Sequence, residues 1–174
     1  MKFKVLSRQA FEEFKSDEAY IAISITDPNS EDAIIGDTNN LHYILTLQFH
    51  DVDKPLVKRK ECTMCEGTGY LEIFADVNNG HCYSCTDKMD IKLFNDENAK
   101  TILDFVETYK KGIDFIVVHC EAGISRSAGV AGALSLIYNG TDKEFFEGFF
   151  KPNMLMYRKI LNIYHLQMKY KNNV

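Results

Sequence analysis

Residues 113–138, with the sequence IDFIVVHCEAGISRSAGVAGALSLIY, decide the fold of this chain. The apolar run FIVV at 115–118 is typical of a strand that is buried on both faces of a parallel sheet. The stretch SAGVAGALSLIY at 127–138 is apolar on all sides, which indicates a buried helix. A buried strand that passes through a short loop into a buried helix predicts a layered α/β fold.

The segments on either side extend this pattern. Short runs at 2–6, 20–25 and 41–49 are predicted strands, and apolar residues recur at helical spacing between Asn95 and Lys111. Two further helical stretches follow Thr141 and Asn153. Strands separated by helices predict a central, mainly parallel sheet that is flanked by helices.

The bulk composition fits one globular domain. The chain has 174 residues, of which 45% are hydrophobic and 26% are charged. A net charge of -5 argues against nucleic acid as a partner, because such binding depends on clustered Lys and Arg. The sequence has no secretory signal, and no stretch approaches the roughly 20 apolar residues of a membrane span. We therefore expect a single cytoplasmic domain over 1–174 that does not enter a membrane.

The segment 56–90 differs from the rest and is predicted to be an insertion within the domain. It holds four of the five cysteines, Cys62, Cys65, Cys82 and Cys85, in the spacing C-x2-C-x16-C-x2-C. This spacing is typical of a structural zinc site, in which four thiolates fill the tetrahedral coordination of Zn²⁺. The alternatives are unligated thiols or a redox pair. A filled zinc site would organise this insertion and would not take part in catalysis.

The loop between the predicted strand and helix is suited to bind phosphate. In open α/β sheets ligands bind beyond the carboxyl ends of the strands, and a helix N-terminus offers unpaired N–H groups to an anion. A loop at this place can surround a phosphate dianion with successive N–H groups. The predicted phosphate-binding residues are Glu121, Ala122, Gly123, Ile124, Ser125 and Arg126.

The side chains that flank this loop predict nucleophilic chemistry. The helix N-terminus favours a thiolate at Cys120, and the planar guanidinium of Arg126 can hold two phosphate oxygens at once. The hydroxyl of Ser127 can donate a hydrogen bond to the thiolate when it leaves phosphorus. His119 lies at the end of the strand, where we expect it to orient the loop, because a thiolate formed by the local field needs no base.

The segment HCEAGISRS at 119–127 resembles the His-Cys-x5-Arg-Ser/Thr signature of protein tyrosine phosphatases and their compact dual-specificity branch. The resemblance extends to the strand and loop at 41–55, the helix at 95–111 and the stretch PNMLMYRKIL near the C-terminus. It implies the phosphatase fold, a phosphocysteine intermediate and no metal at the reaction centre. The alternative is an inert buried cysteine in a tight turn.

Phosphoryl transfer to Cys120 also needs an acid to protonate the leaving oxygen. The segment 48–55 has the sequence QFHDVDKP and lies at the end of a predicted strand. It contains two carboxylates, Asp51 and Asp53. In the resembled family the acid often stands in the pattern Asp-x-x-x-Pro, which favours Asp51 over Asp53. Either residue can instead be a solvated loop carboxylate.

The predicted function is hydrolysis of phosphotyrosine in proteins, with phosphoserine and phosphothreonine as further substrates. A phosphoinositide or an RNA 5′-phosphate ranks lower, because the carboxylate of Glu121 should repel a highly charged ligand. A non-catalytic phosphate-binding module is the alternative from another class, although such a module would not need a thiol, an arginine and an acid together. A zinc-ribbon adaptor for nucleic acid conflicts with the negative net charge.

Overall fold

The computed structural model describes residues 1–36, 38–53, 63–66 and 91–172. The chain divides into two compact units, one of Met1–Asp53 with Lys92–Val174 and the other of Lys54–Ile91. All the strands and helices described below belong to the first unit. In the second unit, the described residues 63–66 form a turn in which Cys65 is buried.

Four parallel strands form the sheet of the first unit, in the order β1-β4-β2-β3. Their bounds are Lys2–Ser7 for β1, Tyr20–Thr26 for β2, Leu41–Gln48 for β3 and Phe115–Cys120 for β4. The central strands β2 and β4 are buried along their whole length. Because all four strands run in the same direction, the residues that follow them meet at one edge of the sheet.

Helices lie between β1 and β2, between β3 and β4, and after β4. Their bounds are Arg8–Glu12 for α1, Asp96–Tyr109 for α2, Arg126–Asn139 for α3, Lys143–Phe146 for α4 and Met154–Asn172 for α5. The side chains of Ser7 and Asn95 cap α1 and α2 by accepting hydrogen bonds from backbone N–H groups. Gly140, with φ of 72°, ends α3 in the left-handed conformation that glycine adopts most readily.

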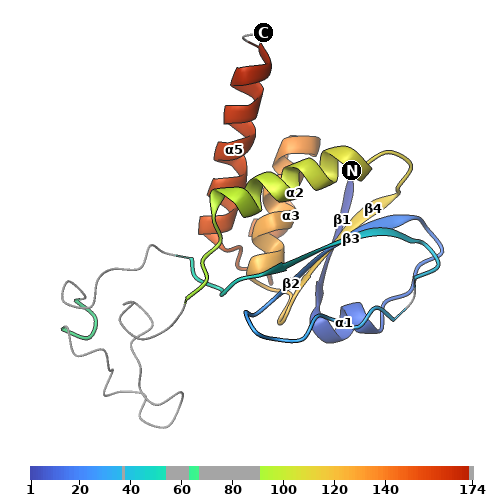
Figure 1. Cartoon of the computed structure of the whole chain (residues 1–174), viewed down its shortest axis with the longest axis horizontal. Helices are drawn as coiled ribbons and strands as arrows, with labels where there is room; N and C mark the ends of the chain where they lie inside the picture. Colours follow the sequence, from blue (N-terminus) through green and yellow to red (C-terminus); the bar gives the residue numbers. More distant parts are fainter. Residues whose placement is uncertain (37, 54–62, 67–90, 173–174) are drawn as a thin grey trace. The chain divides into compact units, whose positions relative to one another are not determined.

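The two faces of the sheet carry separate cores, because alternate residues of a strand point to opposite faces. The larger core packs against α2, α3 and α5 and contains Ile21, Ile23, Ile25, Ile116, Val118, Ile102, Val130, Leu134, Met156 and Ile160. The smaller core lies on the other face with α1 and contains Phe11, Tyr20, Ala22, Ala33, Phe115 and Val117. Figure 1 shows α2, α3 and α5 grouped together, with α1 apart from them.

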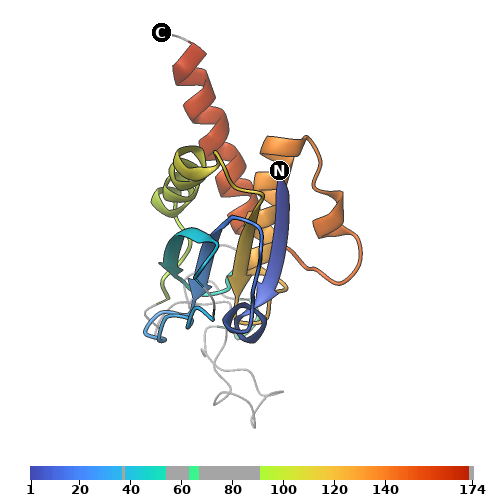
Figure 2. The ribbon, with the colours of Figure 1, turned by 90° about the vertical axis from the view of Figure 1, so that its right-hand side faces the viewer.

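The last helix begins against α2 and α3 and then extends beyond them. Its early residues Met156 and Ile160 are fully buried, whereas Leu166 and Tyr170 near its end are exposed. Figure 2 shows this C-terminal part of α5 projecting beyond the other helices. Within the described residues, none of the helices is long and apolar enough to cross a lipid bilayer.

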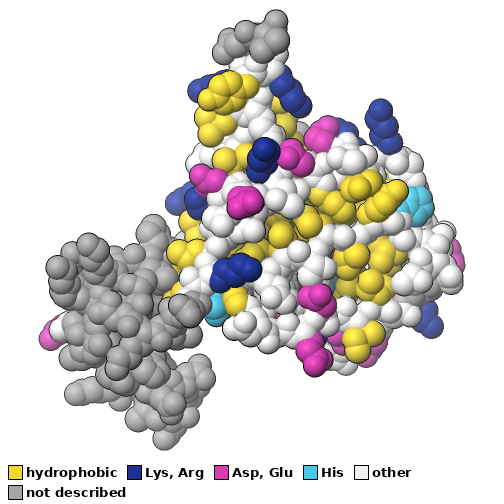
Figure 3. Space-filling model, viewed as in Figure 1, with side chains coloured by type: hydrophobic (Ala, Val, Ile, Leu, Met, Phe, Trp, Pro, Cys, Tyr) yellow, Lys and Arg dark blue, Asp and Glu magenta, His cyan; other side chains and the backbone are white. Residues whose placement is uncertain are grey.

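The α/β fold with a parallel sheet flanked by helices, predicted from the sequence, is confirmed. The predicted helix after Thr141 is only the four-residue α4, since the backbone is already extended at Glu147 and Gly148 follows with φ of 102°. The face drawn in Figure 3 shows Lys and Arg side chains scattered among Asp and Glu.

Candidate active site

The residues that follow the four strands build the site. Arg8 follows β1, Asp27 follows β2, Asp51 comes shortly after β3, and Cys120 ends β4. The backbone register places Ser7 opposite Cys120 and Ser24 opposite His119, so the neighbouring strands end at nearly the same level. This common level explains how side chains from distant parts of the sequence come to surround one loop.

Cys120 lies at the last position of β4, directly before the predicted phosphate-binding loop, and is only 2% exposed. Its Sγ lies 3.1 Å from Oγ of Ser127 in the first turn of α3. A hydroxyl at this distance can donate a hydrogen bond to a thiolate. The pairing of Cys120 with Ser127 is the one that the loop motif led us to expect.

The loop is held to its neighbours through its backbone. The carbonyl of Glu121 accepts a hydrogen bond from Arg8 N, at 3.1 Å. On the other side, the carbonyls of Ile124 and Ser125 accept from Lys151 N and Asn153 N, both at 3.0 Å. Anchors on both sides restrict the loop before any ligand arrives, as a preorganised anion site requires.

Gly123 lies where this loop passes closest to β1. Its φ is 69°, and a Cβ at this position would lie 2.5 Å from Ser7 N and 2.6 Å from the carbonyl carbon of Leu6. Both atoms belong to the backbone of the sheet edge, so they cannot move aside as a flexible side chain would. Glycine is therefore required here by both the conformation and the space.

We expect Gly123→Ala to reduce the free energy of unfolding by roughly 2–4 kcal/mol, through backbone strain and overpacking together. Thermal unfolding followed by circular dichroism measures this loss. Gly140→Ala is the matched control, because Gly140 has φ of 72° but nothing within 4 Å of an added Cβ. Equal losses in the two variants would contradict the importance of the close approach to Leu6 and Ser7.

Arg126 begins α3, and its side chain is 5% exposed. Its Nη1 donates to Oδ1 of Asp27 at 2.6 Å and to the carbonyl of Phe49 at 2.9 Å. Its Nε is buried and has no hydrogen-bond partner among the described residues. One end of the guanidinium is thus held by the protein, while the Nε edge keeps an unused donor.

Asp51 lies beside this guanidinium and the loop. Its Oδ1 accepts hydrogen bonds from Ser125 Oγ and from Asn153 Nδ2, both at 2.8 Å. Its Oδ2 lies 4.0 Å from Nε of Arg126. Oδ1 thus has two donors, whereas Oδ2 has no hydrogen-bond donor among the described residues. Asp53, the other carboxylate of this segment, is exposed and makes no side-chain hydrogen bond or ion pair within the described residues.

Asn153 links Asp51 to the last helix. It is 1% exposed, and its Oδ1 accepts from the backbone N–H groups of Leu155 and Met156, which caps α5. With its amide oxygen engaged by the helix, its Nδ2 points to Asp51. Gly129 of α3 makes room for this residue, since a Cβ there would lie 2.7 Å from Asn153 O.

His119 is fully buried, one residue before Cys120. Its Nε2 lies 2.7 Å from Ser24 Oγ, and its ring stacks on Phe11 with centroids 4.2 Å apart. Burial lowers the pKa of His119 to about 4, so the imidazole is neutral at neutral pH. The side chain is placed to hold β4, β2 and α1 together, in agreement with an orienting role.

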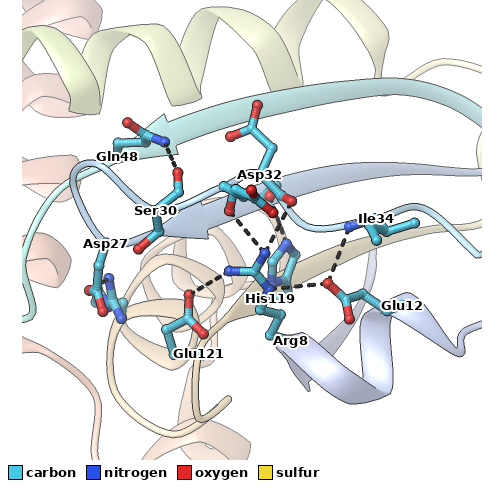
Figure 4. A network of polar contacts seen from close by, with 12 residues as sticks. Arg8, Glu12, Asp27, Ser30, Asp32, Ile34, Gln48, His119 and Glu121 are labelled. Carbon is cyan, nitrogen blue, oxygen red and sulfur yellow. Dashed lines mark hydrogen bonds and ion pairs between the residues drawn. The ribbon is translucent and has the colours of Figure 1, made fainter.

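The side chain of Glu121 is paired with a cation. Its carboxylate lies 3.2 Å from Nη1 of Arg8. The Nε of Arg8 lies 3.1 Å from the carboxylate of Glu12, and its Nη2 donates to the carbonyls of Glu31 and Asp32. Figure 4 shows this network around Arg8. The negative charge of Glu121, which the sequence suggested would repel polyanions, is therefore partly neutralised.

The zinc prediction falls largely outside the described part of the chain. Cys62, Cys82 and Cys85 lie outside the described residues, and Cys65 lies in the turn at 63–66. Among the residues that the structure describes, none form a cluster of three or more metal-binding side chains. The four-cysteine site stays a prediction.

Three site residues were missed by the sequence analysis, namely Asp27, Asn153 and Arg8. Asp27 and Arg8 directly follow strands that the sequence predicted, so the reasoning that found Asp51 could have found them too. Asn153 was seen only as the start of a helix. Its contact with Asp51 spans 102 positions of the sequence, and local patterns contain no signal for such a contact.

Comparison with known proteins found similarity only at the level of structure. No model of a protein family matches the sequence, and no curated protein matches it. A human tyrosine phosphatase-like serine/threonine/tyrosine-interacting protein aligns with 87% of this chain and 80% of its own, with 16% identity and a TM-score of 0.44. Tk-PTP in its active form aligns over 92% and 90% with 14% identity and a TM-score of 0.48. PTPMT1 in complex with PI(5)P aligns over 95% and 85% with 12% identity and a TM-score of 0.47.

Proposed function

We propose that this chain is a phosphatase that hydrolyses phosphomonoesters through a phosphocysteine intermediate on Cys120. The observation that carries the proposal is the assembly at the end of β4. There Cys120 Sγ lies 3.1 Å from Ser127 Oγ, and the buried guanidinium of Arg126 begins the same helix. An inert core cysteine would need neither a buried cation nor a hydroxyl beside it.

The first chemical step is attack of the Cys120 thiolate on phosphorus. The S–P bond forms while the bond from phosphorus to the leaving oxygen breaks, and protonated Asp51 gives its proton to that oxygen. Backbone N–H groups of residues 121–126 and the guanidinium of Arg126 stabilise the charge on the three equatorial oxygens.

The second step is hydrolysis of the intermediate. Water attacks phosphorus, and the ionised Asp51 now accepts the proton of that water. The S–P bond breaks, and Ser127 Oγ can donate a hydrogen bond to the departing thiolate. Inorganic phosphate and the starting enzyme result, so the two steps balance without an oxidant, a reductant or another reactant.

The substrate class that we propose is a phosphorylated protein, with phosphotyrosine as the main target and phosphoserine or phosphothreonine as further ones. Support comes from the resemblance of HCEAGISRS to the tyrosine phosphatase signature. The loop positions 121–125 hold no Lys or Arg to favour a polyanion, so phosphoinositides and RNA 5′-phosphates rank lower. We also propose a cytoplasmic protein whose four cysteines at 62, 65, 82 and 85 bind a structural zinc ion.

Turnover of p-nitrophenyl phosphate without added metal is the test of the proposed activity. Asp51→Asn should reduce turnover of substrates with poor leaving groups by roughly 10²–10⁴-fold, because the amide cannot protonate the leaving oxygen. The loss should be smaller for p-nitrophenyl phosphate, whose leaving group is better, than for phosphotyrosine. Steady-state rates with the two substrates measure the difference.

Asp53→Asn is the matched control for this prediction. It removes the same charge two positions along the same segment, from a side chain without a contact in the described structure. We expect the control to keep the leaving-group dependence of the parent. If only Asp53→Asn shows the selective loss, Asp53 is the acid and the assignment of Asp51 is wrong.

A further inference from the structure

We propose that Asp27 is a positioning residue that orients the guanidinium of Arg126 for phosphate binding. The proposal rests on the phosphatase function above and deepens it. Asp27 lies directly after β2. In the sequence, β2 comes two strands before the signature loop, but in the sheet β2 lies next to β4, the strand that leads into that loop. Its Oδ1 is 2.6 Å from Nη1 of Arg126, which is the shortest contact of that guanidinium.

The contacts at Nη1 determine how the planar group lies. Nη1 donates both to Asp27 and, at 2.9 Å, to the carbonyl of Phe49. Two acceptors at one nitrogen fix the plane of a guanidinium, since its five N–H donors have a rigid geometry. The opposite edge contains Nε, which is buried and has no hydrogen-bond partner among the described residues. That edge is the one left to bind two phosphate oxygens.

Charge makes Asp27 more important than Phe49 in this arrangement. The Arg126 side chain is 5% exposed, and a buried cation is costly unless an anion lies beside it. Asp51 is farther away, at 4.0 Å from Nε, and its Oδ1 is occupied by Ser125 and Asn153. Within the part of the chain that the structure describes, Asp27 is thus the nearest counter-ion of Arg126.

The backbone that carries Asp27 is itself held in place. The carbonyl of Asp27 accepts a hydrogen bond from Ser30 N at 3.1 Å, which closes a turn. The side chain of Gln48 at the end of β3 donates to the carbonyl of Ser30 at 2.9 Å. Figure 4 shows Asp27, Ser30 and Gln48 along this turn. A carboxylate on a fixed turn can hold its partner in one orientation.

The expected consequence is a loss of rate more than a loss of substrate binding. A guanidinium that is free to rotate can still attract a phosphate dianion, but it aligns poorly with the transferring phosphoryl group. We expect Asp27→Ala to lower kcat by about 10–100-fold while KM changes by less than about threefold. Asp27→Asn should retain more activity, because its amide oxygen still accepts a hydrogen bond from Nη1.

The experiment compares the parent, Asp27→Ala and Asp27→Asn with p-nitrophenyl phosphate as the substrate. Orthovanadate resembles the pentacoordinate transition state, so its inhibition constant should rise with the loss of kcat, whereas that of inorganic phosphate should change little. Asp17→Ala is the matched control, because Asp17 is exposed just before β2, away from the edge that carries the site. Melting temperatures identify any variant that is only unstable.

A second test uses the Arg126→Lys background. If Asp27 acts through the guanidinium, Asp27→Ala should have little additional effect on kcat there, so the two losses should not add. Additive losses in kcat, or variants of Asp27 that match the parent, would overturn the positioning role. A parent without phosphatase activity would instead contradict the proposed function, so the two failures are distinguishable.

Discussion

Cys120→Ser is expected to abolish turnover of p-nitrophenyl phosphate, with a loss of roughly 10⁴–10⁶-fold, as is seen when the nucleophile of a covalent mechanism is removed. A serine hydroxyl is a much weaker acid and a poorer nucleophile than a cysteine thiol, so the attacking group is lost. The change is small in volume. The contacts of Arg126 with Asp27 and Phe49 do not involve Cys120 and should remain.

Binding measurements separate this expectation from a simple loss of structure. Because the loop and Arg126 should stay in place, the Cys120→Ser variant should still bind a phosphotyrosine peptide, which calorimetry can measure. Rapid quenching of the parent should trap phosphate on Cys120, and the variant should trap none. If Cys120 were an inert core residue, the variant would keep its turnover and change only its melting temperature, and that result would refute the proposed mechanism.

Arg126→Lys is expected to have the second largest effect, a loss of roughly 10²–10⁴-fold in kcat/KM. The guanidinium of Arg126 can contact Asp27 and Phe49 through Nη1 while its Nε edge remains for phosphate. A lysine ammonium is a compact point charge, so it cannot contact Asp27 and Phe49 and hold two phosphate oxygens at the same time. Steady-state kinetics with p-nitrophenyl phosphate measure the loss.

Arg158→Lys provides the matched control for this change. Arg158 is an exposed residue of α5, so the same substitution there tests the general effect of replacing an arginine. We expect its kcat/KM to equal that of the parent. If Arg126→Lys retained full activity, phosphate binding would not depend on the planar fork of donors, and the role assigned to Arg126 would be wrong.

The elements of this fold could be predicted from the sequence because each has a strong local pattern. The FIVV run of β4 and the continuous apolar surface of α3 fit only buried positions. Asn95 indicates the start of α2 through its capping preference, and the structure has both bonds of the capping box there. Such patterns depend on neighbouring residues alone.

The side chains of the loop were also predictable, since Cys120, Gly123, Arg126 and Ser127 all lie within the short segment 120–127. A short segment between a strand and a helix has few possible conformations, so their proximity follows from the sequence. The order of the strands was not predictable in the same way. It depends on which hydrophobic faces pack together across the whole domain, and no local pattern specifies that choice.

The sequence by itself determined the class of fold, the strand-loop-helix unit and the side chains of the loop. Only the tertiary structure decided that Asp27, Asn153 and Arg8 surround that loop, and that the charge of Glu121 is paired. The physical reason is that local conformation depends on residues a few positions apart. In contrast, the contacts of Arg126 with Asp27 and of Asn153 with Asp51 span 99 and 102 positions and exist only once the parallel strands have aligned.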